Sequence, residues 1–292
     1  MGKRIIHKKT ILLLLPILLL YGVFIGGGLL GVLFESLGYI PSLGLNNLTL
    51  EHYLDIFLDR RFIESLFFSL YIALASALIS TILGVLIAYR LMITTNRLWR
   101  YMTDRVLQIG LILPYLYVVF LTMLFLGKTG FISRIFLNFS WISSLEDFPR
   151  FVFDPYGFGI ILVYVLKGTP FIALFVLNIM SSISTTYHQV ATTLGATESD
   201  ILRKIYLPLA ANTISWTSAI LFTYDLGAFE VPYLLGTNKA VTLSSWLYSL
   251  YLNPHISEIP ASMAMNILLL TIGALSVMIY RWVIKSILMG GR

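Results

Sequence analysis

Six apolar stretches, each long enough to cross a lipid bilayer, dominate this chain of 292 residues. A membrane-spanning helix needs about 20 mainly apolar residues. Backbone polar groups inside lipid must bond to one another, so a helix is the expected conformation of each stretch. We therefore predict an all-α, polytopic membrane protein whose six transmembrane helices form one domain over residues 1–292. The expected spans are 11–34, 65–90, 106–127, 157–180, 210–235 and 260–284.

The composition agrees with this prediction and excludes several kinds of site. Only 12% of the residues are charged, whereas a soluble domain carries about 25%. The chain has no cysteine, which excludes disulfides, thiolate metal sites and cysteine nucleophiles. Its four histidines lie far apart in the sequence, so we expect no metal site.

The first apolar stretch has an alternative interpretation as a signal peptide. Four basic residues precede it, namely Lys3, Arg4, Lys8 and Lys9. We favour a membrane span, because the apolar run is too long for a signal core and no A-x-A-like cleavage site follows it.

The distribution of basic residues predicts the orientation of the spans. The N-terminus, the 90–105 loop, the 181–209 loop and the C-terminus together hold 13 of the 20 basic residues. Lysine and arginine near span ends favour the cytoplasmic side of a membrane, so we expect both termini in the cytoplasm. The net charge of +6 is then a topology signal, and we expect no nucleic-acid partner.

Small residues recur every four positions in the second stretch. They are Ser76, Ser80, Gly84 and Ala88. Such a ridge lets another helix approach closely inside a membrane, so we expect it to be a packing surface.

The 181–209 loop has the pattern of two short helices joined by a turn. The first helix is expected to have one apolar face, because apolar residues stand at positions i, i+3, i+4 and i+7, namely Tyr187, Val190, Ala191 and Leu194. Gly195 then ends the helix. Thr197 followed by Asp200 is a typical start of the next helix, because the hydroxyl accepts a backbone N–H and the carboxylate lies in the first turn.

The second helix is expected to have an apolar side and a defined end. Ile201, Leu202 and Ile205 lie on one side of it. Pro208 cannot continue an ordinary helix, and a proline biases the residue before it toward an extended conformation, here Leu207.

This loop resembles the coupling loop of ABC importer permeases. That family has the pattern E-A-A, three residues, Gly, nine residues, then I-x-L-P. The matching residues here are Ala191, Gly195, Ile205, Leu207 and Pro208, and Ala196, directly after the glycine, is also assigned to the coupling loop. Gln189 replaces the usual glutamate and Val190 the first alanine, so the side chain at position 189 can hydrogen-bond to a partner but carries no charge for an ion pair.

The resemblance implies a function and a set of partners. It implies the type I importer permease fold, in which this loop docks in a cleft of an ATPase subunit and transmits its motion. The implied partners are two ABC ATPase subunits, a second permease subunit that is a copy or a paralogue, and an extracytoplasmic substrate-binding protein. The implied location is a bacterial cytoplasmic membrane. A similar opening of the second span, Leu50-Glu-His-Tyr53 and then Phe62 to Ala73, supports the resemblance.

The chain contains no phosphate-binding loop. The Gly-Lys-Thr at 127–129 has Thr122 where G-x-x-x-x-G-K-[ST] needs its first glycine. We therefore expect no enzymatic activity and no cofactor bound by this chain, with ATP and Mg used by the partner ATPase.

Apart from one arginine at the cytoplasmic end of each of the second and sixth spans, three charged residues lie within the apolar spans, where such groups are costly and usually mark a pathway or a pair. Lys167, Asp225 and Glu230 are therefore candidates for the translocation pathway. Lys167 and Asp225 are expected at similar depth, where they either pair or line a shared cavity.

The segment 225–236 resembles the spermidine/putrescine-type subfamily of these permeases, and its Gly227 and Pro232 predict an irregular outer half of the fifth span. Two acids suit a cationic polyamine, which is the predicted substrate. Relatives in that subfamily move ferric iron, thiamine and aminophosphonates, so these remain alternative substrates.

Two other functions have less support in the sequence. A secondary transporter would usually show internal repeats, and an intramembrane enzyme would need a catalytic set inside the spans; the sequence has neither.

Overall fold

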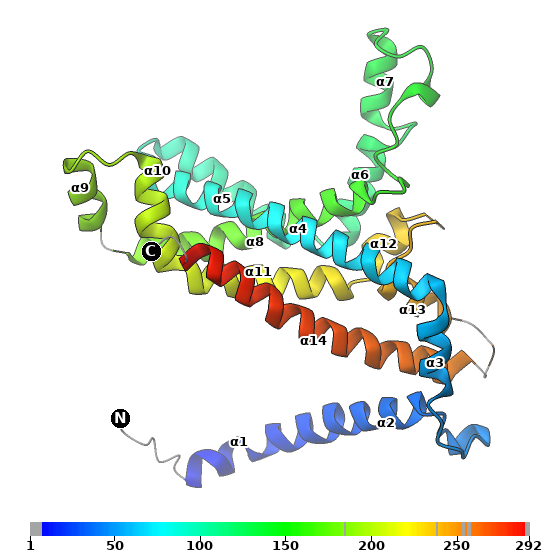
Figure 1. Cartoon of the computed structure of the whole chain (residues 1–292). Coiled ribbons are helices and arrows are strands. Elements are labelled where there is room, and N and C mark those ends of the chain that lie inside the picture. The colour runs from blue at the N-terminus through cyan, green and yellow to red at the C-terminus, as the bar shows by residue number, and fades with distance from the viewer. Residues whose placement is uncertain (1–7, 184, 238, 253–254, 256–257, 290–292) are drawn as a thin grey trace. The chain divides into compact units, whose positions relative to one another are not determined.

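The computed structural model describes residues 8–183, 185–237, 239–252, 255 and 258–289. Within these residues the chain is helical and contains no strand, which confirms the predicted all-α class (Figure 1). The elements are α1 (Lys8–Tyr21), η1 (Gly22–Gly26), α2 (Gly27–Ser36), η2 (Pro41–Leu43), α3 (Glu51–Leu58), α4 (Arg60–Ile93), α5 (Arg97–Ile112), α6 (Tyr115–Leu126), α7 (Phe131–Asn138), η3 (Leu145–Asp147), α8 (Phe158–Ser182), α9 (Thr185–Thr193), α10 (Glu198–Ile201), η4 (Leu202–Tyr206), α11 (Leu207–Gly227), α12 (Glu230–Leu235), α13 (Leu243–Tyr251) and α14 (Ile259–Met289).

Six helical segments are long and apolar enough to cross a membrane. They are Leu13–Ser36, Arg60–Ile93, Tyr115–Asn138, Phe158–Ser182, Glu198–Gly227 and Ile259–Met289. The number of spans agrees with the sequence prediction, but the third and the fifth differ substantially in position, since the structure places the third later and the fifth earlier than the predicted 106–127 and 210–235.

The chain divides into two compact units. One consists of residues 1–62 and 247–271, and the other of residues 63–246 and 272–292. The second unit holds all the residues that the sequence singles out for function. The single domain over residues 1–292 stays a prediction.

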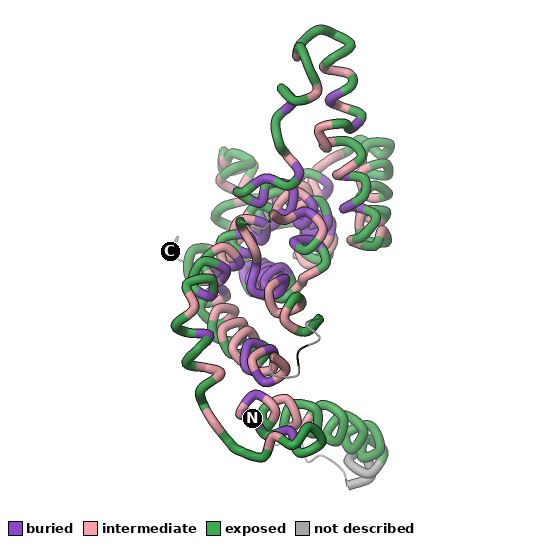
Figure 2. The backbone as a smooth tube through the Cα atoms, turned by 90° about the vertical axis from the view of Figure 1, so that its right-hand side faces the viewer, coloured by how far each residue is buried: buried purple, intermediate pink, exposed green. Residues whose placement is uncertain are grey.

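The core of the second unit forms where α8 packs between α5 and α11. Most of the buried residues of this unit lie on α4, α8 and α11, whereas α5 contributes only Leu107; the buried residues are purple in Figure 2. The small-residue ridge of α4 is part of this core, since Ser76, Ser80 and Ala88 are fully buried. A Cβ atom on Gly84 would lie 2.6 Å from the Cβ of Ile172 on α8. The ridge is therefore a close helix–helix contact, as predicted.

The third expected span, 106–127, is wrong as one continuous helix. Helix α5 ends at Ile112, Leu113 is extended with φ −59° and ψ 127°, and α6 begins at Tyr115. Pro114 explains the break, because it has no N–H to donate and disfavours a helical conformation at the residue before it. The carbonyls at the end of α5 consequently need partners other than the next helical turn.

The fifth span is interrupted in its second half, as the sequence predicts. Helix α11 ends at Gly227, Ala228 is extended, and the short helix α12 begins at Glu230. Helices α8 and α11 run antiparallel, so α9 and α10 lie at one end of the pair and α12 at the other (Figure 1).

Candidate functional site

The turn between α9 and α10 depends on the backbone of Gly195. Its φ of +81° lies in the left-handed region, which glycine adopts without the steric cost of a Cβ. The N–H of Gly195 donates to the carbonyl of Thr192 at 3.0 Å, and the N–H of Ala196 donates to that of Ala191 at 3.0 Å. These bonds close the end of α9 as a glycine C-cap does, and they confirm the predicted break.

The start of α10 is capped as predicted. The hydroxyl oxygen of Thr197 accepts a hydrogen bond from the N–H of Asp200 at 3.2 Å, and the hydroxyl donates to the Asp200 carboxylate at 2.6 Å. The same carboxylate forms an ion pair with Lys204 at 2.7 Å, one turn further along. The cap orders the start of the second helix, and the ion pair, which is exposed, contributes little to it.

The predicted extended conformation at Leu207 is wrong. Leu207 is helical, with φ −60° and ψ −48°, and the helix continues through Pro208 into α11. A π-helical turn, Leu202–Tyr206, comes directly before the proline. We attribute the continuity to this wider turn, because it changes the register of the backbone bonds at the point where the proline has no N–H.

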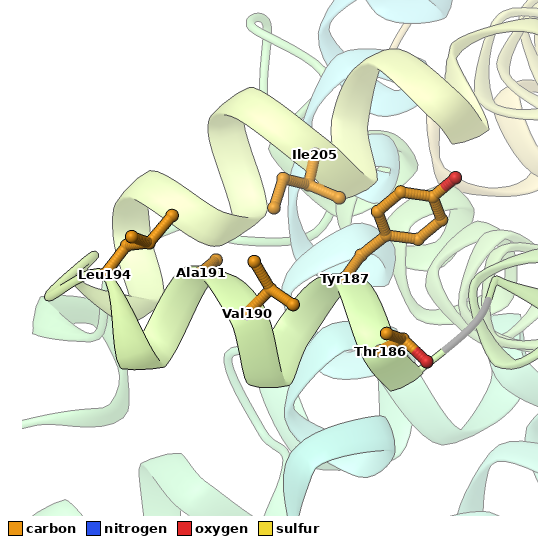
Figure 3. Close-up of a pocket in the computed structure, with 6 residues that line it drawn as sticks. All are labelled: Thr186, Tyr187, Val190, Ala191, Leu194 and Ile205. Carbon is orange, nitrogen blue, oxygen red and sulfur yellow. The ribbon is translucent and has the colours of Figure 1, made fainter.

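The apolar face of α9 is open to its surroundings. Tyr187 is 57% exposed, Val190 53% and Leu194 81%. These residues line a hollow of about 640 Å³, in which Ile205 of the second helix lies across from them (Figure 3). An exposed patch of this kind on a short helix is typical of a surface that another protein covers.

The other residues of the predicted motif surround this face. Gln189 is exposed, and its side chain is available to a partner. Ala191, Ala196, Ile205, Leu207 and Pro208 are half-buried. Four of them, Ala191, Ala196, Ile205 and Leu207, pack against the core cluster of the second unit. The motif thus joins an exposed face to the interior.

Sequence reasoning missed a polar link between this segment and α4. Glu198 accepts a hydrogen bond from the hydroxyl of Tyr89, and its other carboxylate oxygen lies 3.4 Å from Nε2 of His188. The Tyr89 ring is buried and packs edge-on against Tyr206 at 5.7 Å. Tyr89 and Glu198 are 109 residues apart, and no local pattern in the sequence indicates the contact.

Lys167 binds the broken end of α5. Its Nζ donates to the carbonyl oxygens of Gly110, Leu111 and Leu113 at 2.8, 3.0 and 2.5 Å. The side chain is only 7% exposed. A cation at the C-terminus of a helix satisfies unpaired carbonyls and interacts favourably with the helix dipole.

Asp225 has a different environment from Lys167. Its Oδ2 accepts a hydrogen bond from the Ser76 hydroxyl at 2.5 Å. Its Oδ1 is buried and has no partner in the part of the chain that the structure describes. Lys167 and Asp225 therefore each bind other groups, and the structure does not join them in the direct ion pair that the sequence left open.

Glu230 lies in the first turn of α12, and its side chain is exposed, whereas Lys167 and Asp225 are buried.

Three tyrosines gather in the same region of the unit. Tyr115 stacks on Tyr224 with ring centroids 4.9 Å apart and meets Tyr164 edge-on at 6.1 Å. The Lys167 ammonium lies 5.2 Å from the centre of the Tyr115 ring. The sequence analysis missed these tyrosines, because single aromatic residues in apolar spans have no distinguishing pattern.

Among the described residues, no group of three or more histidine, cysteine, aspartate or glutamate side chains is placed to hold a metal ion. The chemistry available at these sites is hydrogen bonding, charge and apolar contact.

Comparisons with known proteins agree with this geometry. The glucose import system permease protein GlcT of Saccharolobus solfataricus is 29% identical over 211 residues, which cover 70% of this chain and 71% of that protein. The spermidine/putrescine transport system permease protein PotB of Escherichia coli is 25% identical over 236 residues, which cover 80% of this chain and 81% of that protein.

Solved structures show the same fold. A chain of a bacterial alginate ABC transporter, solved in complex with an alginate pentasaccharide-bound periplasmic protein, matches with a TM-score of 0.77 at 21% identity, over 92% of this chain and 91% of that one. The MetNI methionine ABC transporter matches with a TM-score of 0.54 at 16% identity, over 78% of this chain and 94% of that one.

The family comparison covers most of the second unit. The model of the binding-protein-dependent transport system inner membrane component family matches residues 80–288. This range includes the 181–209 loop and all three charged residues of the spans. The fold is that of ABC type I importer permeases, and the chain belongs to the family of binding-protein-dependent transport system inner membrane components.

Proposed function

We propose that this chain is the transmembrane permease subunit of an ATP-driven importer, and that the 181–209 loop couples it to a separate ATPase. One observation carries the proposal, namely the exposed apolar face of α9, held on a capped turn at the end of the membrane helices. A short helix that exposes Tyr187, Val190 and Leu194 needs a partner to cover them. The chain itself binds no cofactor, and ATP and Mg act in the ATPase.

The proposed assembly has two ATPase subunits, a second permease subunit and an extracytoplasmic substrate-binding protein. The alginate transporter, which shares the fold, has been solved with its periplasmic protein bound, and this supports a binding protein as partner. A six-span permease needs a second one to enclose a pathway. Both termini and the 181–209 loop then face the cytoplasm, in agreement with the excess of basic residues there.

The proposed substrate is a polyamine of the spermidine/putrescine kind. Asp225 and Glu230 place two carboxylates near the interruption of the fifth span. The Lys167 ammonium is held by three carbonyls, so it is not available to an anionic substrate. The similarity to PotB, which is named as a spermidine/putrescine permease, also supports a polyamine.

A sugar is the second candidate substrate. The similarity to GlcT, which is named as a glucose import permease, favours it. Tyrosine rings and carboxylates also bind sugars, because the rings stack on apolar faces and the carboxylates accept hydrogen bonds from hydroxyl groups.

An affinity pull-down from the native membrane in mild detergent tests the assembly. Mass spectrometry is expected to identify an ATPase subunit, a second six-span protein and an extracytoplasmic binding protein. Ligand screening of that binding protein against putrescine, spermidine and glucose then discriminates the two substrate classes. Recovery of the chain alone, with transport intact after reconstitution, would identify a secondary transporter instead.

A further inference from the structure

The segment that carries the exposed face of α9 is tied to α4 by side chains from three elements. Glu198 stands at the first position of α10, directly after the capped turn. Its carboxylate accepts a hydrogen bond from the Tyr89 hydroxyl, which also reaches the Glu198 carbonyl oxygen at 3.1 Å. On the other side, Glu198 Oε1 lies 3.4 Å from His188 Nε2 on α9. We call Tyr89, Glu198 and His188 the bridge.

The two ends of the bridge differ in burial. Tyr89 is 4% exposed and belongs to the core cluster of the second unit, together with Tyr206. The side chains of His188 and Glu198 are 27% and 55% exposed. The bridge therefore begins in the packed interior and ends on α9, the helix with the exposed face.

Ring packing holds the bridge in one geometry. The Tyr89 and Tyr206 rings meet edge-on at 5.7 Å, and the His188 ring lies 6.5 Å from that of Tyr206. Edge-to-face contacts of this kind orient the rings. The Tyr89–Glu198 bond is charge-assisted when the carboxylate is ionised, and such bonds are about twice as strong as neutral ones.

We infer that the bridge makes α9 and α4 move as one body, so that a displacement of α9 reaches α4 directly and not only along the chain through α10 and α11. The inference rests on the proposed coupling role of the 181–209 loop. Tyr89 and Glu198 are positioning residues in this account, because they act through α9 and contact neither nucleotide nor substrate. Helix α4 carries the ridge that packs on α8 and the Ser76 that binds Asp225, so the bridge links the docking face to the core of the span bundle.

A distance measurement tests the rigid link in the permease alone. The chain has no cysteine, so Thr192→Cys on α9 and Leu86→Cys on α4 introduce two unique spin-label positions, both on exposed residues. In lipid nanodiscs, electron paramagnetic resonance is expected to give a narrow distance distribution for this pair. Tyr89→Phe, which deletes only the hydroxyl, is expected to broaden it. Glu198→Ala is a second variant, because it removes the accepting carboxylate of a side chain that is 55% exposed, and it is also expected to broaden the distribution.

The matched control is Lys204→Gln, which breaks an exposed ion pair one turn away without touching the bridge. It is expected to leave the distribution narrow. Equal widths in wild type, Tyr89→Phe and Glu198→Ala would overturn the inference, whether or not an ATPase partner is found.

The consequence for coupling is tested in proteoliposomes that contain the complete transporter. Labelled putrescine, spermidine and glucose are offered in parallel, and ATP hydrolysis is measured in the same vesicles. Tyr89→Phe is expected to hydrolyse ATP while the substrate imported per ATP falls at least about fivefold. The double variant with Glu198→Ala is expected to be no worse than the worse of the two single variants, because both substitutions break the same link. Unchanged import per ATP, or additive losses, would contradict a shared bridge.

Discussion

The ammonium group of Lys167 donates a hydrogen bond of 2.5 Å to the carbonyl oxygen of Leu113, the residue at which Pro114 ends α5. Two further bonds, to the carbonyls of Gly110 and Leu111, complete the contact. The carbonyls at the end of α5 lack the N–H donors that a continuous helix would supply. Lys167 on α8 donates to three of these carbonyls instead. The contacts of this candidate pathway residue are thus with the broken end of a helix.

Replacing Lys167 is therefore expected to weaken the fold. Lys167→Met leaves three carbonyls without donors in a buried site, and an unsatisfied buried group costs roughly 1–3 kcal/mol. We expect a lower temperature of thermal aggregation in detergent for Lys167→Met, and a smaller loss for Lys167→Arg, which keeps donors. Equal stability of Lys167→Met and wild type would contradict the capping role.

The same geometry predicts the outcome of a charge exchange. Lys167→Asp combined with Asp225→Lys is not expected to restore the assembly lost in the single variants, because the two groups bind different partners. Full recovery of the assembled complex in the double variant, measured by size-exclusion chromatography, would indicate direct pairing.

The apolar face of α9 is expected to decide whether the ATPase binds. Leu194→Asp places a charge where a partner must bury an 81% exposed leucine, and an unpaired buried charge is costly. Co-purification of the ATPase subunit with the variant is expected to fall at least about tenfold, which corresponds to about 1.4 kcal/mol.

Thr192→Asp is the control for that variant, since Thr192 is exposed on the side of α9 away from the face. Its co-purification is expected to equal that of wild type. Equal loss in both variants would indicate general damage to the loop and would count against a specific docking face.

Two substitutions of Gly195 distinguish the effect of an added charge from the effect of an added side chain on the backbone. Its φ of +81° is tolerated by asparagine and aspartate better than by other residues, and a Cβ there meets no atom within 4 Å. Gly195→Asp is expected to remain in the membrane and to uncouple ATP hydrolysis from transport, because it adds a charge next to the docking face. Gly195→Asn keeps the shape without the charge and is expected to transport. Normal uptake by Gly195→Asp would refute the coupling assignment.

Asp225 is expected to affect transport of a cation. Asp225→Asn keeps the hydrogen bond from Ser76 possible but removes the charge on a carboxylate whose Oδ1 has no partner among the described residues. The variant is expected to take up putrescine at least about tenfold more slowly than wild type. Glucose uptake by a sugar-transporting relative serves as the assay control. Unchanged putrescine uptake would remove Asp225 from the pathway.

The features that the sequence predicts correctly are those that depend on neighbouring residues or on a single residue type. The capped turn at Thr197, the break at Gly195 and the close contact at Gly84 depend on residues near one another in the chain or on one residue type, and the structure confirms them. The interruption of the fifth span follows from its Gly227 and Pro232 in the same way.

The missed features depend on distant partners or on competing effects. Pro114 is a sequence signal for a break in the third span. The prediction of one continuous helix over 106–127 relies on the high hydropathy of these residues and gives the proline too little weight. The partner of Lys167 is main chain that the break exposes, which no side-chain pattern reveals. Leu207 stays helical because a π-helical turn precedes Pro208, and such turns have no reliable sequence signature.

The most direct test of the central claim is uptake into proteoliposomes that contain this chain, its second permease and the binding protein, with and without the ATPase subunit. The account predicts that substrate accumulates only when the ATPase and internal MgATP are both present. Accumulation of the same substrate without the ATPase would contradict it, because the energy would then come from another source.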